Sequence, residues 1–96
     1  MTEKERMDAG LLYICEDDNI MKVQLQHLEK LYDFNETRPS QLELREKLLH
    51  EMFAEIGEDC YIEPPLRANW GGAPVYFGDH VYANFNLTLV DDGNIY

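Results

Sequence analysis

A six-residue repeat near the C-terminal end of the sequence constrains the fold more than any other feature. From Phe77 onward, successive blocks of six residues open with an apolar side chain, at Phe77, Ala83, Leu89 and Ile95. This period matches neither an isolated helix nor a simple alternating strand, and it is typical of a parallel β-helix. In the left-handed form of this fold, three hexads make one triangular coil and each opening residue points inward. We therefore expect 77–94 to form one coil.

Two helical segments are expected before residue 36. Thr2 and Glu5 have the spacing of a capping box, which predicts a short helix as far as Ala9 with Gly10 as its left-handed stop. A second helix, capped within 16–19, should end near 33–35. Its apolar face is expected to comprise Ile20, Val23, His27, Leu28, Leu31 and Tyr32.

A third helix is expected after the break at Pro39. Ser40 and Glu43 again have capping-box spacing, and Gly57 is a natural stop. The expected buried face is Leu42, Leu49, Met52, Phe53 and Ile56. The six-residue period begins at Ile56 and is interrupted between 68 and 76 by a loop rich in glycine and proline.

These patterns predict an α+β fold in two segments. Residues 1–56 form a helical N-terminal cap, and residues 57–96 form the first coils of a left-handed parallel β-helix. A chain of 96 residues can bury one modest core, so we expect one cooperative unit.

Composition excludes several classes of function. The net charge of −11 argues against nucleic acid or an anionic membrane as a partner, because phosphate groups are bound by clustered Lys and Arg. No apolar run has the length of a membrane span, and the first residues do not resemble a signal peptide. Cys15 and Cys60 lack metal-ligand spacing and fit reduced thiols. We therefore expect a cytoplasmic protein without a metal site.

Several blocks resemble the maltose and galactoside O-acetyltransferases, which are hexapeptide-repeat enzymes. The similar blocks are Met1–Met7 with Ala9-Gly10, Ser40–Phe53, Glu63-Pro64-Pro65, Tyr82-Ala83-Asn84-Phe85-Asn86 and Val90-Asp91-Asp92. The resemblance covers nearly all of this chain and about the first half of a family member. It implies a homotrimer that transfers an acetyl group from acetyl-CoA to a sugar hydroxyl, with the acceptor pocket between neighbouring subunits.

The resemblance also implies which residues bind the acceptor. Tyr82, Asn84 and Asp92 match positions that line the pocket, and Asn69 matches a polar loop position there. A carboxylate and an amide can bind sugar hydroxyls, and tyrosine offers an amphipathic ring. Each residue also has a structural interpretation: Asn84 as a corner residue, Asp92 as a turn residue and Tyr82 as a packing residue. Asp91 and Asp92 hint at calcium, but the spaced ligand set of a calcium loop is missing.

No histidine of this chain stands where the family has its general base. His27 is expected on a helix face, His50 in a polar helical stretch and His80 at a hexad corner, while the base is expected about one coil beyond Tyr96. Acyl transfer to an alcohol needs a group that accepts the hydroxyl proton. We therefore expect no catalytic residue within these 96 residues and no activity from this chain alone.

The sequence departs from the family at two acceptor contacts. Where galactoside-type members have an acidic and a basic residue, the aligned positions hold Cys15 and Gln24, although Asp17 lies near the first. The identity of the acceptor sugar therefore stays open. Two alternatives to the enzyme interpretation also stay open: a non-catalytic module for oligomerisation or sugar binding, and an acidic helical adaptor for a protein partner.

Overall fold

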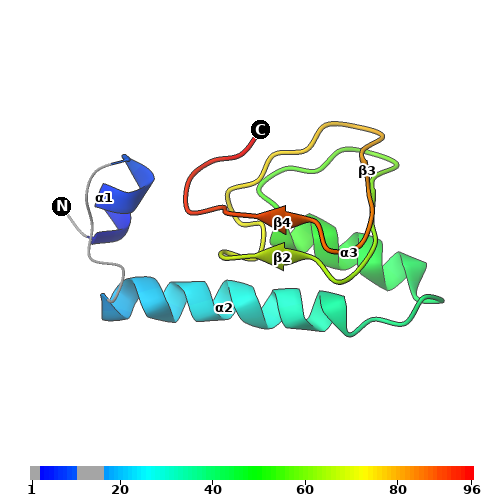
Figure 1. Ribbon diagram of the computed structural model, residues 1–96, viewed down its shortest axis with the longest axis horizontal. Coiled ribbons are helices and arrows are strands. Elements are labelled where there is room, and N and C mark those ends of the chain that lie inside the picture. The colour runs from blue at the N-terminus through cyan, green and yellow to red at the C-terminus, as the bar shows by residue number, and fades with distance from the viewer. Residues whose placement is uncertain (1–2, 11–16) are drawn as a thin grey trace.

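The computed structural model describes residues 3–10 and 17–96, within which three helices precede four short strands (Figure 1). The helices are α1 (Glu3–Asp8), α2 (Asp18–Asn35) and α3 (Leu42–Met52). The strands are β1 (Tyr61–Ile62), β2 (Arg67–Ala68), β3 (Tyr82–Ala83) and β4 (Thr88–Leu89). No helix in these ranges has the length and apolar character needed to cross a bilayer.

The helices before residue 36 lie close to where the sequence predicts them. Gly10 has a φ of +75°, so it provides the expected left-handed stop after α1. Asp17 caps α2 by accepting hydrogen bonds from the backbone N–H groups of Asn19 (3.0 Å) and Ile20 (3.2 Å). The expected cap at Thr2 and the apolar run 11–14 lie outside the described residues.

One assignment on the buried face of α2 is wrong. Ile20 and Leu31 are buried as expected, but Tyr32 is 63% exposed and Phe34 is fully buried instead. Phe34 lies three residues after Leu31, so both project from the same side of the helix. Phe34 packs into the core shared with the coils.

Helix α3 differs more from its prediction. It begins at Leu42 with Gln41 as the N-cap, and no side chain caps it, so the predicted capping box at Ser40 is wrong. The Gln41 side chain instead accepts a hydrogen bond from the backbone N–H of Arg38 (2.7 Å). The helix ends at Met52 because Phe53 is already extended. Leu42 is 57% exposed, so its assignment to the buried face is also wrong, whereas Arg45 is buried.

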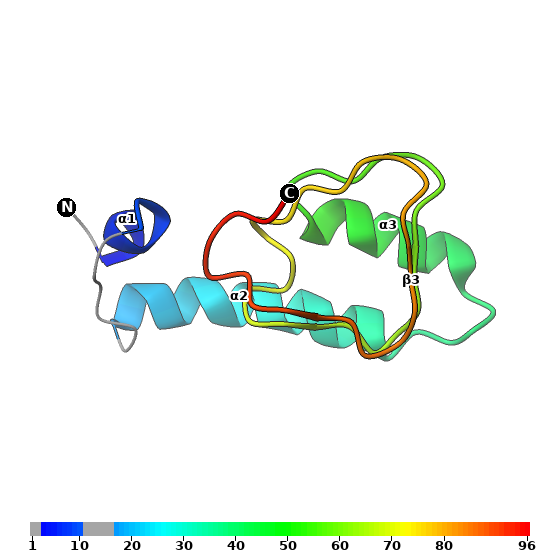
Figure 2. The ribbon, with the colours of Figure 1, turned by 45° about the horizontal axis from the view of Figure 1, so that its top comes forward.

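The strands belong to two successive coils that follow nearly the same path (Figure 2). β1 pairs with β3, and β2 pairs with β4, both in parallel. Parallel pairing between coils, together with short strands after a helical segment, is the expected fold class. The opening residues of equivalent hexads in the two coils stack: Ile62 pairs with Ala83, and Ala68 pairs with Leu89.

The register locates the irregular insertion that the sequence predicts. Paired residues lie twenty-one positions apart, as in Tyr61 with Tyr82, whereas three hexads would place them eighteen apart. The pairing of Val75 with Ile95, twenty positions apart, resumes after the loop that follows Ala68. From Ala68 to Val75 the first coil takes seven positions, whereas the matching stretch from Leu89 to Ile95 takes six, so the first coil has an extra residue in this interval.

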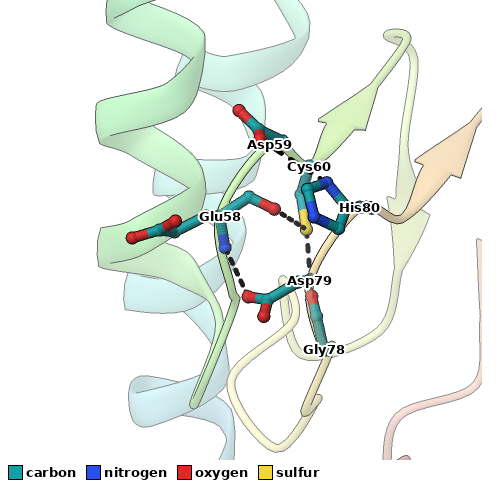
Figure 3. Close-up of polar contacts among 6 residues, drawn as sticks. All are labelled: Glu58, Asp59, Cys60, Gly78, Asp79 and His80. Carbon is teal, nitrogen blue, oxygen red and sulfur yellow. Dashed lines mark hydrogen bonds and ion pairs between the residues drawn. The ribbon is translucent and has the colours of Figure 1, made fainter.

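Equivalent corners of the two coils stack on one another (Figure 3). Asp59 and His80, also twenty-one positions apart, both have a left-handed backbone, with φ of +56° and +57°. The Asp79 carboxylate accepts a hydrogen bond from the N–H of Glu58 (2.8 Å), and the Cys60 thiol donates to the carbonyl of Gly78 (3.1 Å). His80 therefore lies at a hexad corner, as predicted.

The larger of two apolar clusters in the described residues joins α2 and α3 to the coils, and a smaller one joins Met7 of α1 and Ile20 of α2 to Trp70. The buried members of the larger cluster include Phe34 from α2, Leu49 from α3, and Ile62 and Val75 from the first coil. The remaining buried members are Leu31, Met52, Phe53, Ile56, Leu66 and Ala68. The boundary at residue 56 stays a prediction.

Candidate functional site

A pocket of about 330 Å³ lies where α1, α2 and the second coil meet. Its walls combine an indole, an imidazole, an ammonium group and three carboxylates. The lining residues are Lys4, Met7, Asp8, His27, Trp70, Ala73, Pro74, Tyr76, Asp91, Asp92, Gly93 and Asn94. A concave site with a few converging polar groups is the usual place for a small ligand. Asp92 is the acceptor residue predicted from the sequence that lines this pocket.

The buried carboxylate of Asp91 holds one wall of the pocket. It accepts hydrogen bonds from the backbone N–H groups of Trp70 (2.7 Å) and Gly72 (2.8 Å). Both of its oxygens are therefore used to bind the loop, because an unsatisfied buried carboxylate would be costly. No group of three or more His, Cys, Asp or Glu side chains among the described residues is arranged to hold a metal ion. Asp91, which weakly suggested calcium in the sequence, instead uses its carboxylate to bind the backbone N–H groups of the loop.

The same turn brings two predicted acceptor residues together. The Asn69 side-chain amide donates a hydrogen bond to Asp92 (3.3 Å), across the gap between the loop and the second coil. The Gln24 amide on α2 donates to the backbone carbonyl of Asn69 (2.8 Å). Three segments far apart in the sequence therefore converge on one polar chain: Gln24, Asn69 and Asp92.

His27 lies against the indole of Trp70 in the same pocket. Their ring centroids are 6.1 Å apart, and the Lys4 ammonium lies 5.0 Å from the centroid of the indole ring. Burial lowers the pKa of His27 below its ordinary value of 6.5, and the positive charges of Lys30 and Lys4 lower it further, while Asp91 opposes them. At neutral pH the pocket therefore contains an uncharged imidazole.

Tyr82 and Asn84 lie outside this pocket. The Tyr82 side chain is 69% exposed and stacks on Tyr61, with ring centroids 5.8 Å apart and planes inclined by 22°. Asn84 is exposed, and its side-chain oxygen accepts a hydrogen bond from the backbone N–H of Phe85 (2.8 Å). The structure thus brings Asn69 and Asp92 together in one place, whereas Tyr82 and Asn84, two positions apart in the sequence, lie on a different part of the coil.

The three histidines are distributed over different parts of the structure. His27 lines the pocket, and His50 is an exposed residue in the last turn of α3. His80 lies at its corner with Nδ1 3.5 Å from an oxygen of Asp59 (Figure 3). Neither His50 nor His80 lines the pocket.

Comparison with known proteins identifies the family. Residues 6–57 match the model of the maltose acetyltransferase hexapeptide capping motif. The chain belongs to the maltose and galactoside O-acetyltransferase family. It is 48% identical over 92 residues to a galactoside O-acetyltransferase from Lactococcus lactis, covering 96% of this chain and 44% of that protein. It is 40% identical over 92 residues to the Escherichia coli galactoside O-acetyltransferase, covering 96% of this chain and 45% of that protein.

Solved structures support the same assignment. A galactoside acetyltransferase in complex with coenzyme A superposes with a TM-score of 0.88 at 39% identity, covering 98% of this chain and 46% of that one. A maltose O-acetyltransferase from Clostridium difficile superposes with a TM-score of 0.93 at 28% identity, covering 98% of this chain and 50% of that one. The chain therefore spans about half the length of the relatives that it matches.

Sequence reasoning missed three residues that shape the site. Trp70 and Asp91 were part of a loop and a turn with no periodic signal, yet they form the pocket wall. Tyr61 lies in the hexad that begins at Ile56 and was not singled out, although its ring stacks on that of Tyr82. Two aromatic residues twenty-one positions apart would have indicated this stack only if the coil length had been known.

Proposed function

We propose that this chain forms the acceptor-binding part of an O-acetyltransferase that moves an acetyl group from acetyl-CoA to a sugar hydroxyl. In this reaction the sugar oxygen attacks the thioester carbon, the C–S bond breaks, and the hydroxyl proton passes to a base. Family membership supports the reaction class. The contact between Asn69 and Asp92 at the pocket is the structural observation that best supports acceptor binding.

Each predicted residue has a chemical role in this proposal. The Asp92 carboxylate accepts hydrogen bonds from sugar hydroxyls, and the Asn69 amide holds that carboxylate in place. Asn84 positions the reacting hydroxyl, and the exposed ring of Tyr82 contacts the apolar face of the sugar. The general base is a histidine that these 96 residues do not supply, so the chain alone carries no transferase activity.

The separation of the two residue pairs fits a site shared between copies of the chain. Asn69 and Asp92 lie by the pocket, whereas Tyr82 and Asn84 are exposed elsewhere on the coil. In a homotrimer with cyclic symmetry, one part of a subunit faces a different part of its neighbour. We propose that the acceptor is bound between Asp92 of one copy and Asn84 of the next.

We expect acetyl-CoA, the co-substrate in this proposal, to bind outside the pocket described above. Coenzyme A carries several phosphate charges, and the carboxylates of Asp8, Asp91 and Asp92 would repel them. A neutral sugar meets no such repulsion. The chain's own polar groups therefore suit the acceptor, and the co-substrate is expected to bind to other parts of a cytoplasmic enzyme.

A chimera tests the proposal. Residues 1–96 are joined to the part of the Lactococcus lactis enzyme that follows the matched region, and acetyl transfer to galactosides, maltose and glucose is measured. We expect turnover by the chimera and none by the 96-residue chain. Asp92→Ala should mainly raise KM for the sugar, Asn84→Ala should lower kcat/KM more strongly, and both should leave KM for acetyl-CoA nearly unchanged.

Three results would contradict the proposal or part of it. Turnover by the 96-residue chain alone would show that it contains its own base. A folded, inactive chimera, together with binding of galactosides by the 96-residue chain, would instead identify a non-catalytic sugar-binding module. A defect of Asp92→Ala confined to KM for acetyl-CoA would overturn the assignment of that residue to the acceptor.

A further inference from the structure

A buried arginine connects α3 to the first coil. Arg45 is only 4% exposed. Its Nε and Nη2 donate to the hydroxyl and carbonyl oxygens of Thr37 (2.8 and 3.3 Å), and its Nη1 donates to the hydroxyl of Tyr61 (3.1 Å). None of these described acceptors is a carboxylate, although burying a guanidinium is costly unless its charge is compensated. The contact with Tyr61 leads to that compensation.

The hydroxyl of Tyr61 links the arginine to a carboxylate. It accepts from Arg45 and donates to Glu63. The hydrogen bond to Glu63 raises the pKa of Tyr61, burial and the negative charge of Glu63 raise it further, and Arg45 opposes them. The phenol therefore keeps its proton at neutral pH, and both hydrogen bonds can persist. Two partners in different directions leave the hydroxyl little freedom to move.

Packing alone does not hold this ring. A groove of about 330 Å³ borders Tyr61, and its lining includes Leu42, Arg45 and Glu46 on α3. On that side the ring has open space, so its orientation depends on the hydrogen bonds of its hydroxyl. A rotation that breaks them would leave the Arg45 guanidinium with an unmade contact in a buried position.

The orientation of Tyr61 is transmitted to Tyr82. The two residues are directly paired in the parallel register of β1 and β3, so their side chains project side by side. Their rings stack at 5.8 Å with an inclination of 22°. Tyr82 is 69% exposed, so its stack on Tyr61 is the contact that orients its ring.

We propose that Arg45, Tyr61 and Glu63 form a positioning network that fixes the ring of Tyr82 as a platform for the apolar face of a pyranoside. The inference rests on the proposed function, because it takes Tyr82 as an acceptor contact. The three residues act through Tyr82 and touch no substrate themselves. A ring that is already oriented loses less freedom when the sugar binds, and this is how supporting residues improve a binding site.

The order of the Tyr82 ring tests the network directly. In the 96-residue chain with ¹³C-labelled tyrosine rings, NMR would report the contact between the rings of Tyr61 and Tyr82 and the flip rate of the Tyr82 ring. Tyr61→Phe keeps the ring and removes both hydrogen bonds, so we expect Tyr82 to flip about three- to tenfold faster. Tyr32→Phe is the matched control, because it removes a hydroxyl from an exposed tyrosine of α2 and should leave Tyr82 unchanged.

A second pair of variants separates positioning from folding. Glu63→Ala removes the acceptor for the Tyr61 hydroxyl and should reproduce the effect of Tyr61→Phe, whereas Glu63→Gln keeps an acceptor oxygen and should restore the ordered ring. If Tyr61→Phe fails to fold, Glu63→Ala and its glutamine partner decide the question. An unchanged Tyr82 ring in both Tyr61→Phe and Glu63→Ala would overturn the network.

The acceptor side is measured in the chimera. Tyr61→Phe should raise KM for the sugar about three- to tenfold with KM for acetyl-CoA unchanged, in parallel with the loosening of the Tyr82 ring. If Tyr82→Ala leaves the sugar KM unchanged while Tyr61→Phe still loosens the ring, the role of Tyr82 in the proposed function fails and the network stands. If the sugar KM depends on Tyr82 and the ring stays ordered in Tyr61→Phe, the network fails and the proposed function stands.

Discussion

At the scale of single residues, the loop 69–74 depends on two glycines that let the backbone approach its neighbours closely. Gly71 has a φ of +61°, and a Cβ there would lie 2.5 Å from the carbonyl oxygen of His27 on α2. Gly72 has a φ of +90°, and a Cβ there would lie 2.4 Å from the ring of Phe53. Both contacts are closer than real side chains allow, so this loop lies against the helices only because it lacks side chains there.

Gly72→Ala is therefore expected to destabilise the protein by about 1–3 kcal/mol, through a strained backbone and overpacking against Phe53. Chemical denaturation would measure the loss. Gly78→Ala is the matched control, because a Cβ at Gly78 meets nothing within 4 Å and its φ is not in the left-handed region. Equal losses for the two variants would show that the loop can move away from Phe53.

Because of His27, the free energy of unfolding should fall as the pH drops below about 6.5. The pKa of His27 in the folded state is lowered from 6.5, so the contribution of the neutral imidazole to stability is fully present above that value. As pH falls below 6.5, the unfolded chain binds a proton before the folded chain does, and stability is lost. His27→Gln should flatten this part of the profile in urea denaturation at several pH values. His50→Gln, which changes an exposed histidine, is the control, and equal profiles for wild type and His27→Gln would contradict the prediction.

The sequence allowed only part of the site to be predicted at this scale. Asn69 and Asp92 were chosen through the resemblance, and the structure brings them together. Trp70 was not chosen, and Asp91 was considered only as a weak calcium ligand, because a buried carboxylate that binds backbone N–H groups has no local sequence pattern. Their roles arise from a contact between segments about twenty residues apart, which periodicity cannot reveal.

At the scale of elements, α3 contributes a narrower apolar face than its spacing predicts. Leu49, Met52 and Phe53 are buried in the shared core, whereas Leu42 is exposed and Arg45 occupies the interior position near the start of the helix. Phe53 also contacts Phe77 of the second coil edge-to-face, with ring centroids 5.1 Å apart. The end of α3 thus joins the helical cap to the coils.

Phe53→Ala should cost about 3–5 kcal/mol, because Phe53 is 5% exposed and its removal leaves a cavity between α3 and both coils. Leu42→Ala, at a 57% exposed position in the same helix, should cost less than about 1 kcal/mol. Denaturation of both variants compares them directly. A small loss for Phe53→Ala would show that the core does not depend on this junction.

The bounds of an element could be predicted where they depend on neighbouring residues. They could not be predicted where they depend on contacts with distant parts of the chain. The Asp17 cap, the end of α2 and the inward residues of the hexads follow from neighbouring residues, and the structure confirms them. The end of α3 was placed too late, because Glu55 leaves the helix to pair with Tyr76 of the second coil. The twenty-one-residue register likewise depends on how the loop 69–74 packs, so the interruption could be seen in the sequence but its effect on pairing could not.

At the scale of the whole molecule, the four residues proposed to bind the acceptor lie in two places on one chain. Asn69 and Asp92 lie by the pocket between α1, α2 and the second coil, and Tyr82 and Asn84 are exposed on the coil beside Tyr61. One copy thus presents the two pairs separately. A closed ring of copies can bring unlike parts of neighbouring subunits together, and each such contact would then hold both pairs.

Mixing two variants of the chimera tests this arrangement. Asp92→Ala and Asn84→Ala each damage every site of a uniform trimer. When equal amounts are unfolded and reassembled together, about one site in four should receive Asp92 from one copy and Asn84 from its neighbour, because the copies combine at random in the ring. We expect that fraction of wild-type kcat/KM for the sugar to return, well above the activity of either variant alone. The control is a chain that carries both substitutions, mixed with wild type. In that mixture a shared site is intact only where two wild-type copies are neighbours, so the doubly substituted chain completes no site. If the mixture of single variants shows only the average of their separate activities, Asp92 and Asn84 act within the same copy, and the acceptor does not bind between subunits.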